Sequence, residues 1–359
     1  MCILVDKVRK GLAAIKRISG PTWGATLEKR HQLYHGKLLA QIVYACAAWF
    51  LHDPFNDPCH EKIMFGISPR ALSLLESLQI EMLLVISRAW KQTPVTLIEK
   101  EIHVLPILLK LHSVAMNHRC QKYDSKEYEL IKFDTQHKHP FTQMGLLVDQ
   151  HVRHIREVRR LHHDDEAELE DLWQKPAKRK VWVKDFTYKK AFEEAKKRFD
   201  LWARAQAAKP DGLTKILNPA YRTGFGDHCF SLYFGLAAAQ QTMLLGLRTG
   251  NIGINTNPVL RRATQSSDMS CPRCGDPLHT IKHLMFQCPE TIRHLPSLID
   301  AASHSDFDRF MTEDTDLISS YAIAYFGLDQ FDSVKDQARY QFPRRRTVIR
   351  TKGNADYKK

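Results

Sequence analysis

Three cysteines and one histidine near the carboxyl end of the chain are spaced like the ligands of a single metal ion. They are Cys271, Cys274, His283 and Cys288, in the segment CPRCGDPLHTIKHLMFQC, which follows the pattern C-x2-C-x8-H-x4-C. Two cysteines two residues apart lie on one tight turn, and Gly275 follows where such a turn needs a residue that tolerates positive φ. Three thiolates and one imidazole form a closed tetrahedral Zn²⁺ site of the structural kind. The sequence therefore predicts a zinc site.

Two alternatives remain open for this segment. The cysteines can be buried thiols that hold no metal, although four residues of ligand type at this spacing rarely coincide by chance. The fourth ligand can also be His279, because C-x2-C-x4-H opens the zinc-knuckle pattern. That pattern needs a cysteine where Leu284 stands. We predict His283 as the ligand and keep His279 as the alternative.

A short helix is predicted on the carboxyl side of the cysteine turn. Residues 280–287 have a helical pattern, with three apolar residues on one side: Ile281, Leu284 and Met285. A helix there would bring His283 and Cys288 toward the cysteine turn. We therefore expect the helix to position the second half of the ligand set.

The elements around this turn define the last two regions of the chain. A helix predicted over 229–247 leads through the glycine-punctuated segment LRTGNIGIN to the cysteine turn, within a zinc-binding domain at 228–300. Residues 301–359 are predicted to form two closing helices, over 306–311 and 316–326, and then a basic disordered tail from Pro343 onward.

The first 118 residues have helical periodicity with short loops between the periodic stretches. Apolar residues recur every three or four residues, and two further short helices begin at Thr93-Pro94 and at Leu105-Pro106. The predicted helices cover 3–18, 27–50, 69–90, a stretch after Pro94, and 106–116. This pattern indicates an all-α unit. The fold class predicted for the whole chain is mainly α.

Residues 119–227 have weaker periodicity and more charge. Arginines and histidines crowd residues 151–163, an acidic run follows, and 188–207 is a helix rich in Glu, Lys and Arg. We interpret this region as a charged linker with surface helices, and its arginines and lysines can alternatively contact phosphates. For its tryptophans, core packing is the favoured interpretation over stacking on bases; they are Trp173, Trp182 and Trp202.

Composition narrows the class of partner. The 359 residues carry a formal net charge of +13, which favours an acidic partner, with nucleic acid first and a membrane surface second.

No run of about 18 uncharged apolar residues occurs, so no membrane span is expected. Eight cysteines are too few for a secreted disulfide scaffold of this length. We expect a nuclear or cytoplasmic protein in a reducing compartment.

Several catalytic signatures are missing from the sequence. It contains no G-x4-G-K-[ST] or G-x-G-x-x-G phosphate loop and no G-x-S-x-G elbow. The adjacent aspartates Asp164 and Asp165 lie in the polar stretch LHHDDEAELE, which is typical of an exposed helix start rather than a buried two-metal site. We assign no catalytic residue and no cofactor-binding residue apart from the zinc ligands.

The cysteine segment and the stretch before it resemble the carboxy-terminal end of LINE-type (non-LTR) retrotransposon reverse transcriptases. In that family an LRTGH-x-x-LN stretch precedes a zinc segment C-x-x-CG…E-T-x-x-H-L-L-x-x-CP. This chain has LRTGNIGIN with Asn251 in place of the usual histidine, and then CPRCG and TIKHLMFQCP. The matching positions are Leu247, Arg248, Thr249, Gly250 and Asn255, followed by Cys271, Cys274, Gly275, Thr280, His283, Leu284, Cys288 and Pro289.

The amino-terminal part is similar to the same family. LYHGKLLAQIVYACAAWF resembles the family's segment after the polymerase palm, and a second family segment resembles Leu74–Trp90 with Thr93-Pro94 and the following EIHVLPILLKL. In the family these segments lie in or just after the thumb. The resemblance covers 23–115 and 228–295. It implies a helical thumb-like region over 1–118 and a place near the end of a larger retrotransposon polyprotein. The palm with its paired aspartates would precede Met1, and no RNase H-like strand is found in the middle region.

These observations give one favoured function and two alternatives. The resemblance implies zinc-dependent, sequence-tolerant binding of RNA or DNA by a truncated, non-catalytic fragment. Basic residues near the zinc segment are the predicted phosphate contacts: Arg248, Arg261, Arg262, Arg273 and Lys282. The alternatives are a structural or interaction remnant that binds no nucleic acid, and part of an active RNA-directed DNA polymerase whose palm is missing from this chain.

Overall fold

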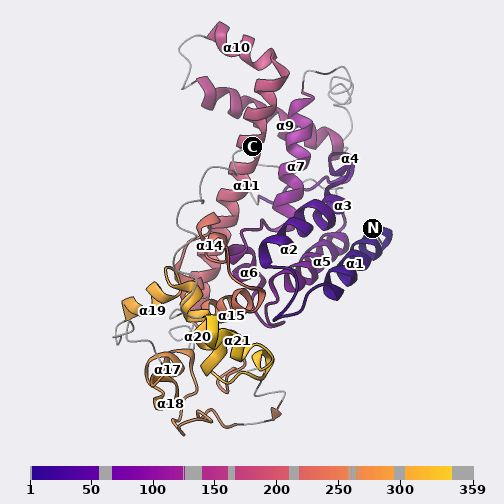
Figure 1. Ribbon diagram of the computed structural model, residues 1–359. Coiled ribbons are helices and arrows are strands. Elements are labelled where there is room, and N and C mark those ends of the chain that lie inside the picture. Colours follow the sequence, from indigo (N-terminus) through magenta and orange to yellow (C-terminus); the bar gives the residue numbers. More distant parts are fainter. Residues whose placement is uncertain are drawn as a thin grey trace. The chain divides into compact units, whose positions relative to one another are not determined.

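The computed structural model describes residues 2–55, 67–123, 125, 140–160, 166–209, 218–257, 260, 264–265, 267–294 and 304–341. Within these residues the chain is helical and contains no strand, apart from one isolated bridge between Ser19 and Gly24 (Figure 1). The predicted mainly α fold class is therefore confirmed. None of the described helices combines the length and apolar character that crossing a bilayer requires.

The chain divides into two compact units. Unit 1 comprises residues 1–9, 36–81 and 104–200, and unit 2 comprises residues 10–35, 82–103 and 201–359. The division falls within four of the described helices: α1 (Cys2–Arg17), the π-helical η1 (Tyr34–Leu39), α5 (Pro69–Ser87) and α11 (Pro176–Ala207). Each unit is therefore assembled from several separate stretches of the sequence.

Unit 1 has a core formed by four helices. They are α7 (Ile107–Gln121), α9 (Pro140–Arg160), α10 (Glu166–Gln174) and α11. Their shared buried side chains are Met116, Cys120, Leu147, Val148, Val152, Ile155, Trp173, Trp182 and Val183. On α9 these residues recur at three- and four-residue spacing, which places them along one side of the helix.

The predicted linker therefore contributes apolar side chains to a core. Trp173 is 1% exposed and Trp182 is 8% exposed, so core packing is confirmed for both. Their rings also meet arginines, with Arg156 over Trp173 and Arg159 over Trp182. Trp202, in unit 2, stacks on Tyr221 with the ring centroids 5.5 Å apart.

The helix predicted over 27–50 is interrupted in the structure. It comprises α2 (Leu27–Leu33), the π-helical η1 (Tyr34–Leu39), α3 (Ala40–Val43) and α4 (Cys46–Trp49). Ala45 takes a left-handed conformation with φ 50° between α3 and α4. The guanidinium of Arg119 donates to the carbonyl oxygens of Ala47 and Phe50 at 2.6 and 2.9 Å. This contact satisfies backbone groups that a broken helix leaves without partners.

Unit 2 is organised around α15 (Ala238–Thr249), all of whose residues are buried. It packs against α20 (Thr315–Tyr325), which in turn packs against α21 (Lys335–Gln341) (Figure 1). The shorter α6 (Val95–Glu101), α13 (Pro219–Arg222), α14 (Asp227–Ser231) and α19 (His304–Phe310) belong to the same unit. The two predicted closing helices are confirmed as α19 and α20.

The single helix predicted over 229–247 is wrong, because the chain breaks between α14 and α15. Gly235 lies in that break with φ 76°, a backbone conformation that favours glycine. Its N–H donates to Glu28 Oε1 at 3.2 Å. The side chain of Gln240 then accepts from the N–H of Ala237 at 2.8 Å and so begins α15. These bonds offset the loss of helical backbone bonds at the break.

Candidate metal centre

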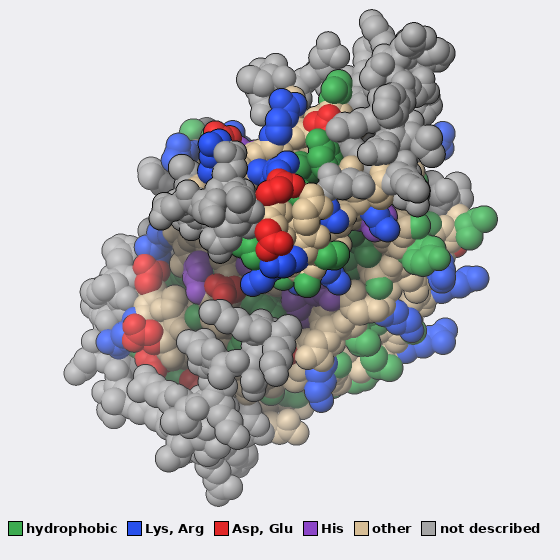
Figure 2. All heavy atoms as spheres, turned by 90° about the horizontal axis from the view of Figure 1, so that it is seen from above, with side chains coloured by type: hydrophobic (Ala, Val, Ile, Leu, Met, Phe, Trp, Pro, Cys, Tyr) green, Lys and Arg blue, Asp and Glu red, His purple; other side chains and the backbone are tan. Residues whose placement is uncertain are grey.

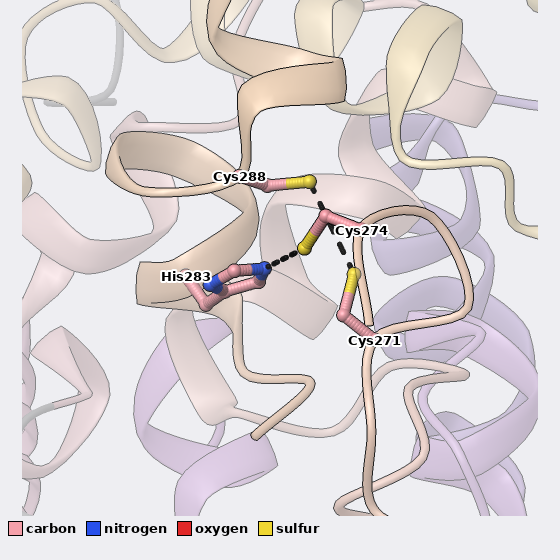
Figure 3. A group of neighbouring side chains, drawn as sticks. All are labelled: Cys271, Cys274, His283 and Cys288. Atoms are coloured by element: carbon pink, nitrogen blue, oxygen red, sulfur yellow. Dashed lines mark hydrogen bonds between the residues drawn. The ribbon is translucent and has the colours of Figure 1, made fainter. Parts of the chain in front are cut away.

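The four predicted ligands come together in unit 2. The ligand atoms of Cys271, Cys274, His283 and Cys288 all lie within 4.8 Å of one another. Cys274 Sγ is 3.2 Å from His283 Nε2, and the sulfurs of Cys271 and Cys288 are 4.0 Å apart (Figure 3). A tetrahedral zinc with bonds of about 2.3 Å to sulfur and about 2.0 Å to nitrogen has ligand separations of roughly 3.5–3.8 Å. The cluster can therefore hold a metal ion such as zinc.

The cysteine turn has the backbone bonds of a compact loop. Gly275 N–H donates to Cys271 O at 2.9 Å, and Cys271 N–H donates to Asp276 O at 2.7 Å. Gly275 has φ 78°, as the sequence predicts. A side chain at this position would be strained, because the left-handed region favours glycine. The turn directs the two sulfurs toward the same point.

Helix α17 (Ile281–Phe286) carries the histidine ligand. Thr280 caps it, since its side chain accepts from His283 N–H at 3.0 Å. The buried apolar residues of the helix are Ile281, Leu284 and Met285, the set that the sequence pattern predicts. Cys288 follows the helix, and its N–H donates to His283 O at 2.7 Å. One helical turn and its end therefore fix the last two ligands.

A second layer of contacts holds the Cys288 side of the cluster. Thr291, in α18 (Pro289–Ile292), donates from its hydroxyl to Leu284 O at 2.5 Å and to Cys288 O at 3.1 Å. The buried hydroxyl of Tyr321 donates to Thr291 O at 2.8 Å. Because Tyr321 belongs to α20, these hydrogen bonds connect the core of unit 2 to the segment that carries His283 and Cys288. Nothing in the local spacing of the sequence indicates this connection.

The alternative ligand His279 has a different place. It is outside the ligand cluster, and its Nδ1 accepts from Asn255 N–H at 3.0 Å. Burial, with a smaller contribution from His283, lowers the pKa of His279 to about 4, so its imidazole is neutral and can accept this bond. Asn255 Nδ2 and Thr256 Oγ1 donate to Ser270 O and His279 O at 2.8 and 2.7 Å. His279 thus joins the loop after α15 to the cysteine turn.

The surroundings of Cys274 and Cys288 shift the pKa values of these two thiols in opposite directions. The backbone N–H of Asp276 lowers the pKa of Cys274, but burial and the neighbouring thiols outweigh it and raise that pKa to about 11. For Cys288, burial raises the pKa, while the backbone N–H of Glu290 and the side chain of Thr291 bring it below its ordinary value. A bound divalent cation favours the thiolates, and its binding releases protons.

Asp276 provides a carboxylate next to the histidine ligand. His283 Nδ1 is buried, has no hydrogen-bond partner among the described residues, and lies 3.7 Å from Asp276 Oδ2. Metal-bound histidines generally direct the second ring nitrogen to a carboxylate, which fixes the ring and raises its basicity. Asp276 Oδ1 also accepts from Leu278 N–H at 2.9 Å.

We expect Asp276→Asn to weaken zinc binding by roughly tenfold, because the amide keeps the bond to Leu278 but removes the negative charge beside His283. Competition with a chromophoric chelator measures the affinity. Asp332→Asn, an exposed aspartate paired with Lys335, is the matched control. Equal affinities for the two variants would show that Asp276 does not support the ligand.

The predicted phosphate contacts divide into three groups. Arg248 is fully buried, and its guanidinium binds both oxygens of Glu101 at 2.6 and 3.0 Å, so it is not at the surface where a phosphate could meet it. Arg261 and Arg262 lie outside the described residues. Arg273 is exposed between the two turn cysteines, and Lys282 is half-buried on α17.

Arg248 belongs to a buried polar network that the sequence does not reveal. Lys100 Nζ lies 2.7 Å from Glu101 Oε1 and donates to Ala220 O at 2.9 Å. The Tyr233 hydroxyl donates to Glu101 Oε2 at 2.7 Å, and Arg248 Nη1 donates to Met311 O at 2.8 Å. Glu101 therefore connects α6, α15 and the segments beside them.

The aspartates Asp164 and Asp165 and the basic tail lie outside the described residues.

Comparison with known proteins adds no relative to this picture: no family model, curated protein or solved structure matches the chain.

Proposed function

We propose that this chain binds nucleic acid with little dependence on the base sequence. The binding region is residues 270–291, which a zinc ion would hold together. The chain performs no catalysis with its own residues. The proposal includes a retroelement origin, as a relative of the carboxy-terminal part of LINE-type reverse transcriptases. The observation that supports it most is the convergence of four ligand atoms within 4.8 Å. In a closed Cys3His site all four coordination positions are taken by protein ligands, so the metal stabilises the fold and has no open position for catalysis.

The charge around the metal centre favours a polyanion as the partner. Arg273 is exposed and stands between two metal ligands, so a bound ion would fix its backbone. The whole chain carries a net charge of +13. On the face shown in Figure 2, however, Lys and Arg side chains are interspersed with Asp and Glu. Because the described residues on this face form no continuous basic surface, the phosphate contacts that we propose are the few basic residues near the zinc turn.

A salt titration tests this function. Fluorescence anisotropy with single-stranded RNA, single-stranded DNA and duplex DNA of mixed sequence is followed between about 50 and 200 mM salt. We expect log K to fall with log salt by about 0.9 for each phosphate contacted on a duplex, and by about 0.7 on a single strand. An affinity that does not change with salt would contradict the proposal.

Charge-matched variants locate the contacts. Arg273→Gln and Lys282→Gln are expected to weaken binding and to reduce the salt slope by about one contact each. Lys197→Gln, an exposed lysine of unit 1, removes the same charge at a distance in the sequence. If all three variants lose the same affinity, the attraction is a property of net charge and the zinc turn is not the contact.

A further inference from the structure

Two arginines of unit 2 carry buried guanidinium nitrogens that lack acceptors. Arg30, on α2, is 0% exposed, and within the described part of the chain its Nε, Nη1 and Nη2 have no hydrogen-bond partner. Arg88 follows α5 and is half-buried. Its Nη2 donates to Ser19 Oγ at 2.6 Å and also to Ser19 O, while its Nε is buried without a partner in the same described region.

The electrostatic surroundings leave this positive charge uncompensated. Burial, followed by the cation Arg88, lowers the pKa of Arg30 to about 10, so Arg30 remains charged at neutral pH. Burial also lowers the pKa of Arg88. Glu28 is the acidic group that favours the charged form of Arg30, but its carboxylate is engaged elsewhere. It accepts from Gly235 N–H at 3.2 Å and from Gln241 Nε2 at 2.7 Å. A buried charge without a partner is strongly destabilising.

An anion would resolve both the missing acceptors and the repulsion. A guanidinium presents its N–H donors in a fixed fork that matches the oxygens of a phosphate group. The two bonds from Arg88 to Ser19 hold that guanidinium in place before an anion arrives. Arg88 is the less buried of the two, so we expect an anion to approach from its side.

We propose that Arg30 and Arg88 form an oxyanion site for the phosphate class, taking either inorganic phosphate or a phosphate of a nucleic-acid backbone. The site uses no zinc ligand and does not depend on the function proposed above. A bound anion would also explain why a charged residue occupies position 30, where a buried apolar residue of similar volume would destabilise the folded state less.

Thermal unfolding of the zinc-loaded full chain tests the site, with inorganic phosphate titrated to about 10 mM against sodium chloride at equal ionic strength. A ligand that binds only the folded state raises Tm, and we expect a rise of roughly 2–4 °C. Arg30→Met is expected to abolish the rise and Arg30→Lys to keep part of it. The control Arg70→Met, at an exposed position of unit 1, is expected to respond as the wild type does.

Stability without phosphate provides a second readout. Arg30→Met should then be at least as stable as the wild type, because it removes an unpaired buried charge. An absent phosphate response in the wild type would overturn the site. An equal response in wild type and Arg30→Met would also overturn it, since phosphate then acts through general exclusion from the protein surface.

A competition experiment distinguishes the two sources of phosphate. If Arg30→Met lowers the affinity for a short oligonucleotide by roughly tenfold and inorganic phosphate competes with that oligonucleotide, the site takes backbone phosphates. If oligonucleotide binding is unchanged while the phosphate response is lost, the site takes the free ion. Failure of the zinc-turn variants to affect oligonucleotide binding would count against the proposed function alone.

Discussion

Removal of the metal, or replacement of Cys271 by serine, is expected to unfold the segment from Ser270 to Thr291. Zinc contributes roughly 10–16 kcal/mol of apparent binding free energy at pH 7 in small structural sites, and most of it is folding free energy. The described segment has a turn, the six-residue α17 and most of the four-residue α18, which cannot replace a contribution of this size. Hydrogen exchange with and without a chelator measures the loss of protection, and metal analysis gives the stoichiometry.

A cysteine outside the cluster supplies the control. Cys46→Ser, in unit 1, should retain one zinc per chain and the protection of α17, while Cys271→Ser and Cys274→Ser should lose both. Zinc binding should also weaken as the pH falls, because protons compete with the metal for the thiolates. Full zinc content in Cys271→Ser would show that the ligand set is different from the one described above.

The second large effect is expected from Glu101→Gln. Glu101 and its partners Lys100 and Arg248 have side chains that are 0% exposed. Removing one member of a buried ion pair costs about 3–5 kcal/mol, because the other charge remains buried without compensation. We therefore expect a loss of this size in the free energy of unfolding of unit 2, measured by urea denaturation. Glu76→Gln, at an exposed position of α5, should change it by less than about 0.5 kcal/mol.

A double variant separates the interaction from the loss of each side chain. Glu101→Gln combined with Arg248→Met should be less destabilised than the sum of the two single variants, because the uncompensated guanidinium is gone. Additive losses would mean that the two groups do not interact. Equal denaturation midpoints for Glu101→Gln and Glu76→Gln would contradict the network itself.

The same network gives a pH dependence with a defined sign. Burial raises the pKa of Glu101, but Arg248 and Lys100 outweigh it and hold the pKa well below the ordinary glutamate value. A carboxyl group whose pKa is depressed in the folded state contributes stability that is complete above its unfolded pKa of about 4.3 and is lost as the pH falls below it. The stability that Glu101 confers should therefore be constant near neutrality and decline in acid, and the decline should be absent in Glu101→Gln.

Local pattern predicted the Cys3His cluster, which could hold a metal ion such as zinc, and several of the described helices. The spacing of Cys271 and Cys274 fixes a turn, and the apolar side of residues 281–285 fixes a helix, so the ligand set follows from interactions between residues close in sequence. For the same reason the closing helices at α19 and α20 follow from their periodicity. Gly275 has the positive φ that its place after the second cysteine requires.

Tertiary contacts decided what each charged or polar residue does. Arg248 has the sequence context of a phosphate contact, but its partner Glu101 is 147 residues away, and no local pattern reveals a buried acid at that distance. His279 and His283 are both plausible ligands by spacing, and the N–H of Asn255 occupies the first of them. Breaks at Ala45 and Gly235 likewise depend on distant partners, Arg119 and Glu28. Spacing records neighbours along the chain, whereas burial and pairing depend on residues that only the folded structure brings together.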